Sequence, residues 1–466
     1  MFYSLNMETL SELYFATSGI RGKANTLISP ELGLRVGRAV SKWVKSQFSK
    51  KLYVYVGFDN RRNSHTIAST IVAGLSSSGI DAKLFAKPVP TPLVIYATAK
   101  SDAKAGLMVT GSHLPRDENG IILFDQHGSY FKGVLEDSNE PPVEWDDLGV
   151  IQNVTYEIQE YQNYLKKLSQ ELKISATQWD VLLDPVHGPM KSHLEYILKP
   201  IVHNLIQFNW KDDDRFSGRL SEPTPKNLKK TSKAVVVSKC DIGIATDMDG
   251  DRVIFILPDG KVVSGDYIGA ILAMKYWEEF PDLPVVVPIN TSAVIEYMAD
   301  KYNGKFEYCK VGPPSIIGKM RELNAKYGFE ETGKYFFSDY AIWPDSSISV
   351  LVLISYLQKR SKSLKEIIDS MPELYASKTK VPADRAYGAE IMKLVEEMIP
   401  RQFDNITKIN SLDGLRVNFD DKSWLLIRPS GTEDYVRVFS EHHIEEKNSE
   451  LNEIGRRMVT KAIASL

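Results

Sequence analysis

Short apolar runs alternate with segments of helical periodicity along most of the chain. Apolar residues at helical spacing predict a helix that begins at Ser29-Pro30, where the serine hydroxyl caps the first turn, and a second helix over about 67–75. Strands are expected at 52–56, 82–85 and 105–109. Strands and helices that alternate at this spacing are typical of βαβ units, so the pattern predicts a parallel sheet.

The same alternation continues after a polar, proline-containing stretch at 137–147, which is typical of a linker. Further strands are expected at 181–183, 285–289 and 424–427. With 466 residues, the chain is too long for one ordinary hydrophobic core, and three or four domains are expected.

The composition narrows the class of protein. The net charge is −3 and the lysines and arginines are spread along the chain, which argues against a nucleic-acid-binding protein. The two cysteines, Cys240 and Cys309, cannot form a disulfide framework and suit a reducing compartment. No signal peptide or apolar run of membrane-spanning length is apparent, so we expect a cytoplasmic protein that is not bound to a membrane.

The most informative stretch for chemistry is 247–251, where aspartates occupy positions 247, 249 and 251 between two apolar runs. In an extended segment alternate side chains share one face, so the three carboxylates are expected to converge. A divalent cation would relieve their mutual repulsion, and a set of oxygen ligands suits Mg²⁺ better than Zn²⁺.

Three other interpretations fit this stretch less well. An EF-hand counted from Asp247 needs glycine and glutamate where Arg252 and Pro258 stand, so it is excluded. The nucleophile motif of haloacid-dehalogenase phosphatases is similar at Asp-x-Asp-Gly, but its later Gly-Asp-x-x-x-Asp has alanine at 270 here. An ordinary acidic turn between two strands stays open on local sequence alone.

Four other loops carry polar residues of the kind that bind phosphate or sugar: Thr17–Gly22, Ser112–Pro115, Glu330–Lys334 and Arg428–Thr432. Each alone is equally compatible with a surface turn or a capping hydroxyl. Ser112 and His113 are adjacent, and neighbouring residues do not form a hydrolase dyad, which needs side chains that face each other.

Taken together and in this order, the loops resemble those of the α-D-phosphohexomutase family, which includes phosphoglucomutases and phosphomannomutases. The resemblance rests on Thr-Ser-Gly-x-Arg-Gly at 17–22, Ser-His-x-Pro at 112–115, Asp-x-Asp-Gly-Asp-Arg at 247–252, Glu-x-Thr-Gly at 330–333 and Arg-Pro-Ser-Gly-Thr-Glu at 428–433. It covers essentially the whole chain.

The resemblance implies an α/β fold of four domains around a central cleft, in which three related α/β domains with mixed sheets precede a smaller C-terminal α+β domain. The expected domains are 1–150 with the phosphoserine loop, 151–258 with the metal loop, 259–372 with the sugar loop and 373–466 with the phosphate loop. The implied activity is that of an isomerase-class phosphotransferase, which interconverts hexose 1-phosphate and hexose 6-phosphate through a phosphoserine and a sugar bisphosphate.

The resemblance also implies roles for individual residues. Catalysis is expected from Ser112, His113, Arg21 and Arg252; Mg²⁺ binding from Asp247, Asp249, Asp251 and Ser112; sugar binding from Glu330, Thr332 and Lys334; and phosphate binding from Arg428, Ser430, Gly431, Thr432 and Arg437, with Lys310 as a further candidate. One Mg²⁺ per site is expected, with the sugar bisphosphate as activator and intermediate. The expected partners are hexose phosphates, and the expected state is a monomer or a homodimer.

Two departures from the family pattern bear on function. Ile122 stands where the family usually has a lysine, and Lys334 stands where it usually has a histidine. The first affects proton transfer at the sugar hydroxyl, and the second affects sugar specificity. Because the acidic loop is complete and Ser112 is retained, a mutase acting on glucose or mannose phosphates is expected, with phosphoglucosamine mutase or a weakly catalytic sugar-phosphate-binding protein as alternatives.

Overall fold

The computed structural model describes residues 12–16, 19–49, 52–137, 141–430 and 433–466. The chain divides into two compact units, one formed by residues up to 264 together with 334–364, and the other by 265–333 and 365–466. Within the described residues no helix is both long enough and apolar enough to cross a bilayer.

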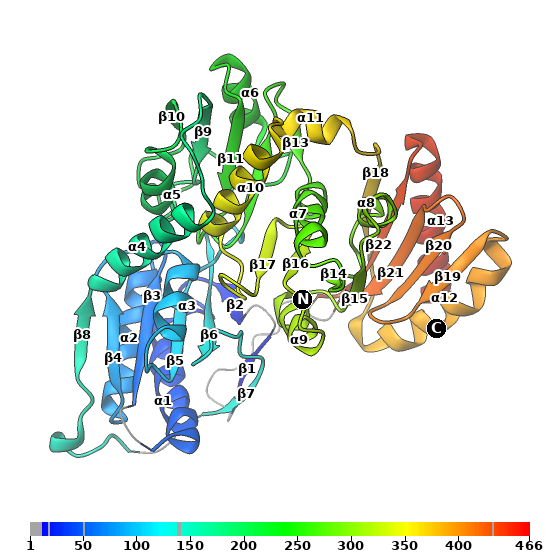
Figure 1. Cartoon of the computed structure of the whole chain (residues 1–466). Helices are drawn as coiled ribbons and strands as arrows, with labels where there is room; N and C mark the ends of the chain where they lie inside the picture. The colour runs from blue at the N-terminus through cyan, green and yellow to red at the C-terminus, as the bar shows by residue number, and fades with distance from the viewer. Residues whose placement is uncertain (1–11, 17–18, 50–51, 138–140, 431–432) are drawn as a thin grey trace. The chain divides into compact units, whose positions relative to one another are not determined.

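The first unit contains a six-stranded mixed sheet in the order β2-β6-β5-β3-β4-β8, with a separate antiparallel pair of β1 and β7 (Figure 1). Its central strands β3, β4 and β5 are parallel, as the sequence predicts. The strands are β1 (Glu12–Phe15), β2 (Ile20–Lys23), β3 (Tyr53–Phe58), β4 (Asp81–Phe85), β5 (Ala105–Val109), β6 (Glu118–Asp125), β7 (Gly133–Glu136) and β8 (Ile151–Val154).

Three helices pack on this sheet, and their boundaries follow local sequence signals. The helices are α1 (Pro30–Gln47), α2 (Ser64–Ser77) and α3 (Thr91–Ala99), and η1 (Trp145–Asp147) precedes β8. Ser29 caps α1 as predicted, because its hydroxyl accepts a hydrogen bond from the Leu32 N–H at 3.3 Å. The apolar faces of α1 and α2 share one buried cluster with the strands, which fixes the strand ends that carry polar loops.

The rest of the first unit contains a five-stranded sheet in the order β10-β9-β11-β12-β13, and β17 lies outside that sheet. Its elements are α4 (Tyr156–Glu171), β9 (Asp180–Asp184), α5 (Lys191–Leu198), β10 (Asn204–Gln207), α6 (Lys229–Val237), β11 (Ile242–Thr246), β12 (Val253–Ile256), β13 (Val262–Val263), β17 (Lys334–Phe337) and α10 (Ser346–Arg360). Helix α10 contacts α4, α5 and β12, so residues from distant parts of the sequence stabilise one core.

The second unit contains the parallel strands β15, β14 and β16 and an antiparallel sheet in the order β18-β22-β21-β20-β19. Helices α12 and α13 pack together, and α13 also contacts β18, β21 and β22. The helices are α7 (Gly265–Glu279), α8 (Val294–Tyr302), α9 (Pro313–Glu322), α11 (Leu364–Asp369), α12 (Gly388–Gln402) and α13 (Glu445–Ala464), with η2 (Arg385–Tyr387) before α12. The strands are β14 (Val285–Pro288), β15 (Phe306–Cys309), β16 (Tyr327–Glu330), β18 (Tyr375–Pro382), β19 (Ile406–Asn410), β20 (Leu415–Phe419), β21 (Trp424–Pro429) and β22 (Tyr435–His442).

Candidate active site

The three aspartates lie in the turn that joins the antiparallel strands β11 and β12. Their side chains are buried, and one oxygen from each lies within 4.8 Å of the others. The carboxylates therefore converge as expected, but the expected extended conformation is wrong. The chain turns instead, with Gly250 at a φ of +71°, where a Cβ atom would lie 2.8 Å from the Met190 side chain.

Each aspartate has one oxygen that accepts a hydrogen bond from a different element. Asp247 Oδ2 accepts from Ser112 Oγ at 2.9 Å, Asp249 Oδ2 accepts from Thr91 Oγ1 at 2.7 Å, and Asp251 Oδ2 accepts from Lys334 Nζ at 2.7 Å; the last pair is also an ion pair. The Oδ1 atoms of Asp249 and Asp251 are buried and have no hydrogen-bond partner among the described residues.

These surroundings make the acidic turn a suitable site for a cation. Burial, followed by repulsion from the neighbouring aspartates, raises the pKa of Asp247 and of Asp249. For Asp251, burial opposes ionisation, but the ammonium of Lys334 and the guanidinium of Arg252 leave its pKa below the usual value. Two buried oxygens without partners and an entirely oxygen donor set fit Mg²⁺.

Ser112 lies in the loop after β5, in a conformation that few side chains adopt. Its φ is +46°, and its N–H donates to Thr110 Oγ1 at 2.8 Å. Residues held in this region of φ/ψ space need support from their surroundings. Ser112 is also buried, so its hydroxyl is held toward Asp247.

Arg61, to which no sequence motif pointed, provides much of that support. Its guanidinium donates to the carbonyl oxygens of Ser112 at 2.9 Å, Leu114 at 2.7 Å and Glu118 at 2.9 Å, and also to that of Pro115. A Cβ atom at position 111 would lie 2.3 Å from Arg61 Cζ, so Gly111 lets the guanidinium approach the loop. The only sequence signal was a polar segment after β3.

Asp59 also supports the serine loop. Its carboxylate accepts from Thr110 Oγ1 at 2.8 Å and from Ser64 Oγ at 2.6 Å, and it forms an ion pair with Arg61 at 3.4 Å. Ser221 adds a further hydrogen bond, because its hydroxyl donates to the Ser112 carbonyl and accepts from the Met248 N–H at 3.0 Å. Ser221 therefore links the serine loop to the acidic turn.

His113, Arg252 and Arg21 surround the same loop. Arg252 Nη2 lies 3.0 Å from His113 Nδ1, and burial together with the nearby guanidinium of Arg252 lowers the pKa of His113 far below its usual value. His113 is consequently neutral, with Nδ1 as the acceptor and the proton on Nε2. Arg21, on β2, donates to the Thr110 carbonyl at 2.6 Å.

The expected sugar-binding residues Glu330 and Thr332 lie in the second unit, where Thr332 Oγ1 donates to Glu330 Oε1 at 2.6 Å. Lys334 begins β17 in the first unit. Its contact with Asp251 was not expected, because residues so far apart in sequence give no local signal. Lys310 is exposed at the end of β15.

The expected phosphate-binding residues lie in the second unit, with Arg428 near the end of β21, Ser430 just after that strand and Arg437 in β22. Arg428 Nε forms an ion pair with Asp413 Oδ2 at 2.9 Å, Ser430 Oγ accepts from the Glu433 N–H at 3.1 Å, and Arg437 Nη2 donates to Tyr435 Oη at 3.0 Å. Gly431 and Thr432 lie outside the described residues, as do Thr17 and Ser18 of the first loop.

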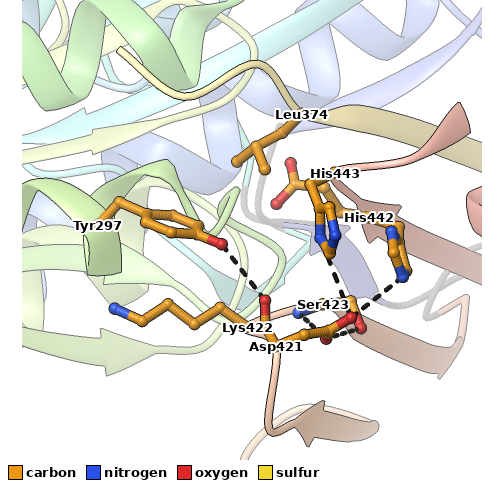
Figure 2. Close-up of a pocket in the computed structure, with 8 residues that line it drawn as sticks. Tyr297, Leu374, Asp421, Lys422, Ser423, His442 and His443 are labelled. Atoms are coloured by element: carbon orange, nitrogen blue, oxygen red, sulfur yellow. Dashed lines mark hydrogen bonds and ion pairs between the residues drawn. The ribbon is translucent and has the colours of Figure 1, made fainter.

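A second group of potential metal ligands, Asp421, His442 and His443, lies in the second unit (Figure 2). The hydrogen bonds and ion pairs of these three residues explain why they lie together without a cation. His442 Nδ1 accepts from the Ile444 N–H at 2.9 Å, so its proton is on Nε2, which lies 3.1 Å from Asp421 Oδ2. If Nε2 bound a metal, the imidazole proton would have to be on Nδ1, where it would face the Ile444 N–H and the hydrogen bond between them would be lost.

Comparison with known proteins decides the family. Models of the phosphoglucomutase/phosphomannomutase domains match in order: α/β/α domain I over residues 12–138, domain II over 159–260, domain III over 264–375 and the C-terminal domain over 377–454. The chain belongs to the phosphoglucomutase/phosphomannomutase family. This confirms the predicted family and its four-domain fold, and places the protein among the phosphohexomutases, which are isomerase-class enzymes.

Individual proteins agree with this assignment. The chain is 31% identical to a probable phosphoglucosamine mutase from Methanosphaera stadtmanae, over 98% of this chain and 100% of the relative. It is 30% identical to a phosphoglucomutase/phosphomannomutase from Thermococcus kodakarensis, over 96% and 99% respectively. A solved structure of a family protein from Burkholderia thailandensis shares the fold, with a TM-score of 0.82 at 20% identity over 97% of both chains.

Proposed function

We propose that this protein is a phosphoglucosamine mutase, which interconverts the 1-phosphate and 6-phosphate of glucosamine through phospho-Ser112. The observation that carries the proposal is the 2.9 Å hydrogen bond from Ser112 Oγ to Asp247, within a buried group of three aspartates. A family mutase needs a phosphoryl carrier beside a cation site, and these residues have the chemistry for both.

The choice of sugar follows the relatives. The expected preference for glucose or mannose has less support than the alternative, because the relative from Methanosphaera stadtmanae is named a probable phosphoglucosamine mutase. The relative named for glucose and mannose phosphates is 30% identical, nearly as similar, so the three sugars must be compared directly.

In the proposed reaction, the Oγ–P bond of phospho-Ser112 breaks while a sugar hydroxyl oxygen bonds to the phosphorus. The proton of that hydroxyl is released, and the serine oxygen finishes as a hydroxyl. The sugar bisphosphate then turns over and returns its other phosphoryl group to Ser112. Both transfers require the same serine position, and Arg61 fixes it by holding the main-chain carbonyls of the loop.

Phosphorylation changes the electrostatics around Ser112. The hydroxyl that donates to Asp247 is lost, and a phosphate next to a carboxylate requires positive charge. Arg252 and Arg21 would donate guanidinium hydrogen bonds to the phosphate. Neutral His113, which accepts a hydrogen bond from Arg252, would keep the Arg252 guanidinium in its orientation. Mg²⁺, held by Asp247, Asp249 and Asp251 with the serine oxygen, would supply further positive charge for the transferring phosphoryl group.

The remaining candidate residues would bind the rest of the substrate. Glu330 would accept hydrogen bonds from sugar hydroxyls, and Thr332 would donate a hydrogen bond to one. Lys334 and Lys310 would add positive charge. Arg428, Ser430, Gly431, Thr432 and Arg437 would bind the phosphate that is not reacting. A fixed anchor of this kind suits a substrate that must bind in two orientations.

The test is a turnover assay with glucosamine 1-phosphate, glucose 1-phosphate and mannose 1-phosphate, each with Mg²⁺ and a trace of the matching bisphosphate. We expect the highest kcat/KM for the glucosamine substrate. Intact-mass spectrometry after incubation with the bisphosphate should show one added phosphoryl group, which the Ser112→Ala variant lacks. Ser46→Ala, at an exposed position on α1, is the matched control and should keep full activity.

The outcomes separate the alternatives. Faster turnover of glucose or mannose phosphate would overturn the sugar assignment while leaving the mutase intact. Full activity of Ser112→Ala would overturn phospho-Ser112. Binding of all three sugar phosphates without turnover would favour the weakly catalytic alternative. Buried Ile122, which replaces the usual lysine, would then explain the lack of turnover.

A further inference from the structure

Three positively charged residues form a row across the antiparallel sheet of the second unit. Strands β18, β22 and β21 are neighbours in this sheet (Figure 1), and Arg437 on β22 is paired with Lys380 on one side and with Arg428 on the other. The side chains of directly opposite residues lie on the same face of a sheet. We call Lys380, Arg437 and Arg428 the cationic row. Two of its members are expected phosphate-binding residues, whereas no sequence motif includes Lys380.

The cationic row lies on the face of the sheet that the helices leave uncovered. Val436 and Val438, on either side of Arg437, are buried in an apolar cluster that also contains residues of α12 and α13. Val381, next to Lys380, belongs to the same cluster. Because successive residues of a strand point to opposite faces, Lys380 and Arg437 point away from these helices.

The same face of the sheet meets the loop that carries the expected sugar-binding residues. Lys378, two residues before Lys380 on β18, shares its face and forms an ion pair with Glu331. Glu331 directly follows Glu330, an expected sugar-binding residue at the end of β16. The sugar loop and the cationic row therefore lie on one side of the sheet.

Neighbouring carboxylates offset only part of the charge of the cationic row. Like charges on opposite residues repel, and Arg428 is compensated by Asp413, which lies 2.9 Å from its Nε atom. Arg437 lies 3.8 Å from Glu433, and an ion pair between side chains that are 37% and 54% exposed contributes little. Arg437 Nε is buried and has no hydrogen-bond partner among the described residues. Within the part of the chain that the structure describes, Lys380 forms no ion pair.

Tyr435 keeps Lys380 beside Arg437. The centre of its ring lies 4.2 Å from Lys380 Nζ and 5.4 Å from Arg437 Cζ, and its hydroxyl accepts a hydrogen bond from Arg437 Nη2 at 3.0 Å. Two positive charges are thus packed against one aromatic side chain. Side chains that are already held in place lose less conformational freedom when an anion binds between them.

We propose that Lys380 is a third cation of the site that binds the phosphate group not undergoing transfer. This inference rests on the proposed function for the identity of the ligand, which is a sugar phosphate monoester. Such a group carries nearly two negative charges at neutral pH and presents three acceptor oxygens. Arg428 and Arg437 would donate hydrogen bonds from their guanidinium groups, and Lys380 would pair as a point charge with an oxygen that they leave open.

The first test measures the binding of inorganic phosphate without Mg²⁺, and hence without turnover. Isothermal titration calorimetry should show that Lys380→Met lowers the phosphate affinity about fivefold, because one of three cations is lost. Arg428→Ala should lower the same affinity, which identifies the binding site as the cationic row. Lys380→Arg keeps the charge and should keep the affinity within about twofold. Lys408→Met, at an exposed position on β19 of the same sheet, is the matched control and should leave the affinity unchanged.

The second test uses steady-state kinetics with whichever of the three sugar phosphates turns over fastest. Lys380→Met should raise KM about fivefold and change kcat by less than about twofold, because an anchor far from the reacting end contributes to the ground state and the transition state alike. Lys380→Arg should restore KM. The difference in KM should become smaller at high salt, since salt screens an exposed ammonium group.

The phosphate titration separates this inference from the proposed function. If no sugar phosphate turns over but Lys380→Met and Arg428→Ala both weaken phosphate binding, the anchor stands and the mutase activity does not. A phosphate affinity that Lys380→Met leaves unchanged would overturn the inference, and so would an unchanged KM in an active enzyme. An equal loss of affinity in Lys408→Met would also overturn it, because the effect would then come from the overall charge of the protein.

Discussion

Lys334 Nζ lies 2.7 Å from Asp251 Oδ2, and both side chains are buried. The family resemblance sets Lys334 where a histidine is usual, so this chain has a lysine ion-paired with one of its three aspartates. The ammonium occupies one oxygen of Asp251 and leaves Oδ1 without a hydrogen-bond partner among the described residues. Lys334 therefore offsets part of the charge that Mg²⁺ would neutralise.

Lys334→Met should bind Mg²⁺ more tightly, by roughly tenfold, which corresponds to about 1.4 kcal/mol. The reason is that Mg²⁺ then enters a site with one more uncompensated negative charge. Isothermal titration calorimetry with Mg²⁺ alone, at about pH 8, measures this affinity independently of turnover. Lys132→Met, at an exposed position, is the matched control.

A Lys334→Met variant with unchanged Mg²⁺ affinity would show that the ion pair does not influence the cation site. We also predict that Lys334 takes part in proton transfer at the sugar hydroxyl, where Ile122 replaces the usual lysine. This role requires that Lys334→Met also lowers kcat and alters its pH profile, because an ammonium that only offsets charge would not change that profile.

Arg61→Lys should lower kcat by at least about tenfold while the protein remains folded. Lysine keeps the charge but lacks the planar fork with which Arg61 reaches four carbonyl oxygens of the serine loop. Loss of serine positioning raises the barrier to phosphoryl transfer without removing a substrate contact, so KM should change little.

Arg62→Lys provides the control for Arg61, because the Arg62 side chain is 79% exposed and pairs with Asp214. Circular dichroism establishes that both variants are folded. Equal kcat in Arg61→Lys and the unmodified protein would mean that the loop keeps its position without the guanidinium.

The sequence predicted local features where a few neighbouring residues determine the structure. The capping of α1 by Ser29 and the convergence of the three aspartates both follow from short motifs. The contact of Arg61 with the serine loop and that of Lys334 with Asp251 could not be predicted in this way, because they join residues 51 or more and 83 positions apart. Such contacts depend on how strands from distant segments pack.

Conformation also limited the prediction of the site. An extended acidic segment was expected, but the positive φ of Gly250 produces a turn that brings the same carboxylates together. Similarly, the family pattern identified Ser112 but not its positive φ. The need for glycine at position 111, where a Cβ atom would meet Arg61, also became apparent only in the structure.

Arg428→Ala should raise KM by about tenfold or more and also lower kcat. Removal of a charge-assisted anchor weakens substrate binding, and the lost binding energy no longer orients the reacting end. Steady-state kinetics with glucosamine 1-phosphate measure both effects. Arg456→Ala, on the exposed side of α13, is the control; an unchanged kcat/KM for Arg428→Ala would mean that the loop after β21 is only a turn.

Asp345 caps helix α10 and should make stability depend on pH. Its carboxylate accepts from the N–H groups of Ser347 at 2.9 Å and Ile348 at 3.2 Å, and from Tyr161 Oη at 2.7 Å. Burial, only partly offset by these hydrogen bonds, raises the pKa of Asp345 from 3.8 to about 6. The folded protein therefore holds the proton more tightly than the unfolded chain does.

Because the folded-state pKa is raised, this stabilisation is complete below about pH 4 and is lost as the pH rises through about 6. Asp345→Asn keeps a capping oxygen but does not titrate. The stability of the unmodified protein relative to Asp345→Asn should thus fall between about pH 4 and pH 7, by up to about 3 kcal/mol. Thermal unfolding of both proteins across this range measures the difference, with Asp102→Asn at an exposed position as control. A difference that does not vary with pH would mean that Asp345 is ionised in the folded protein throughout.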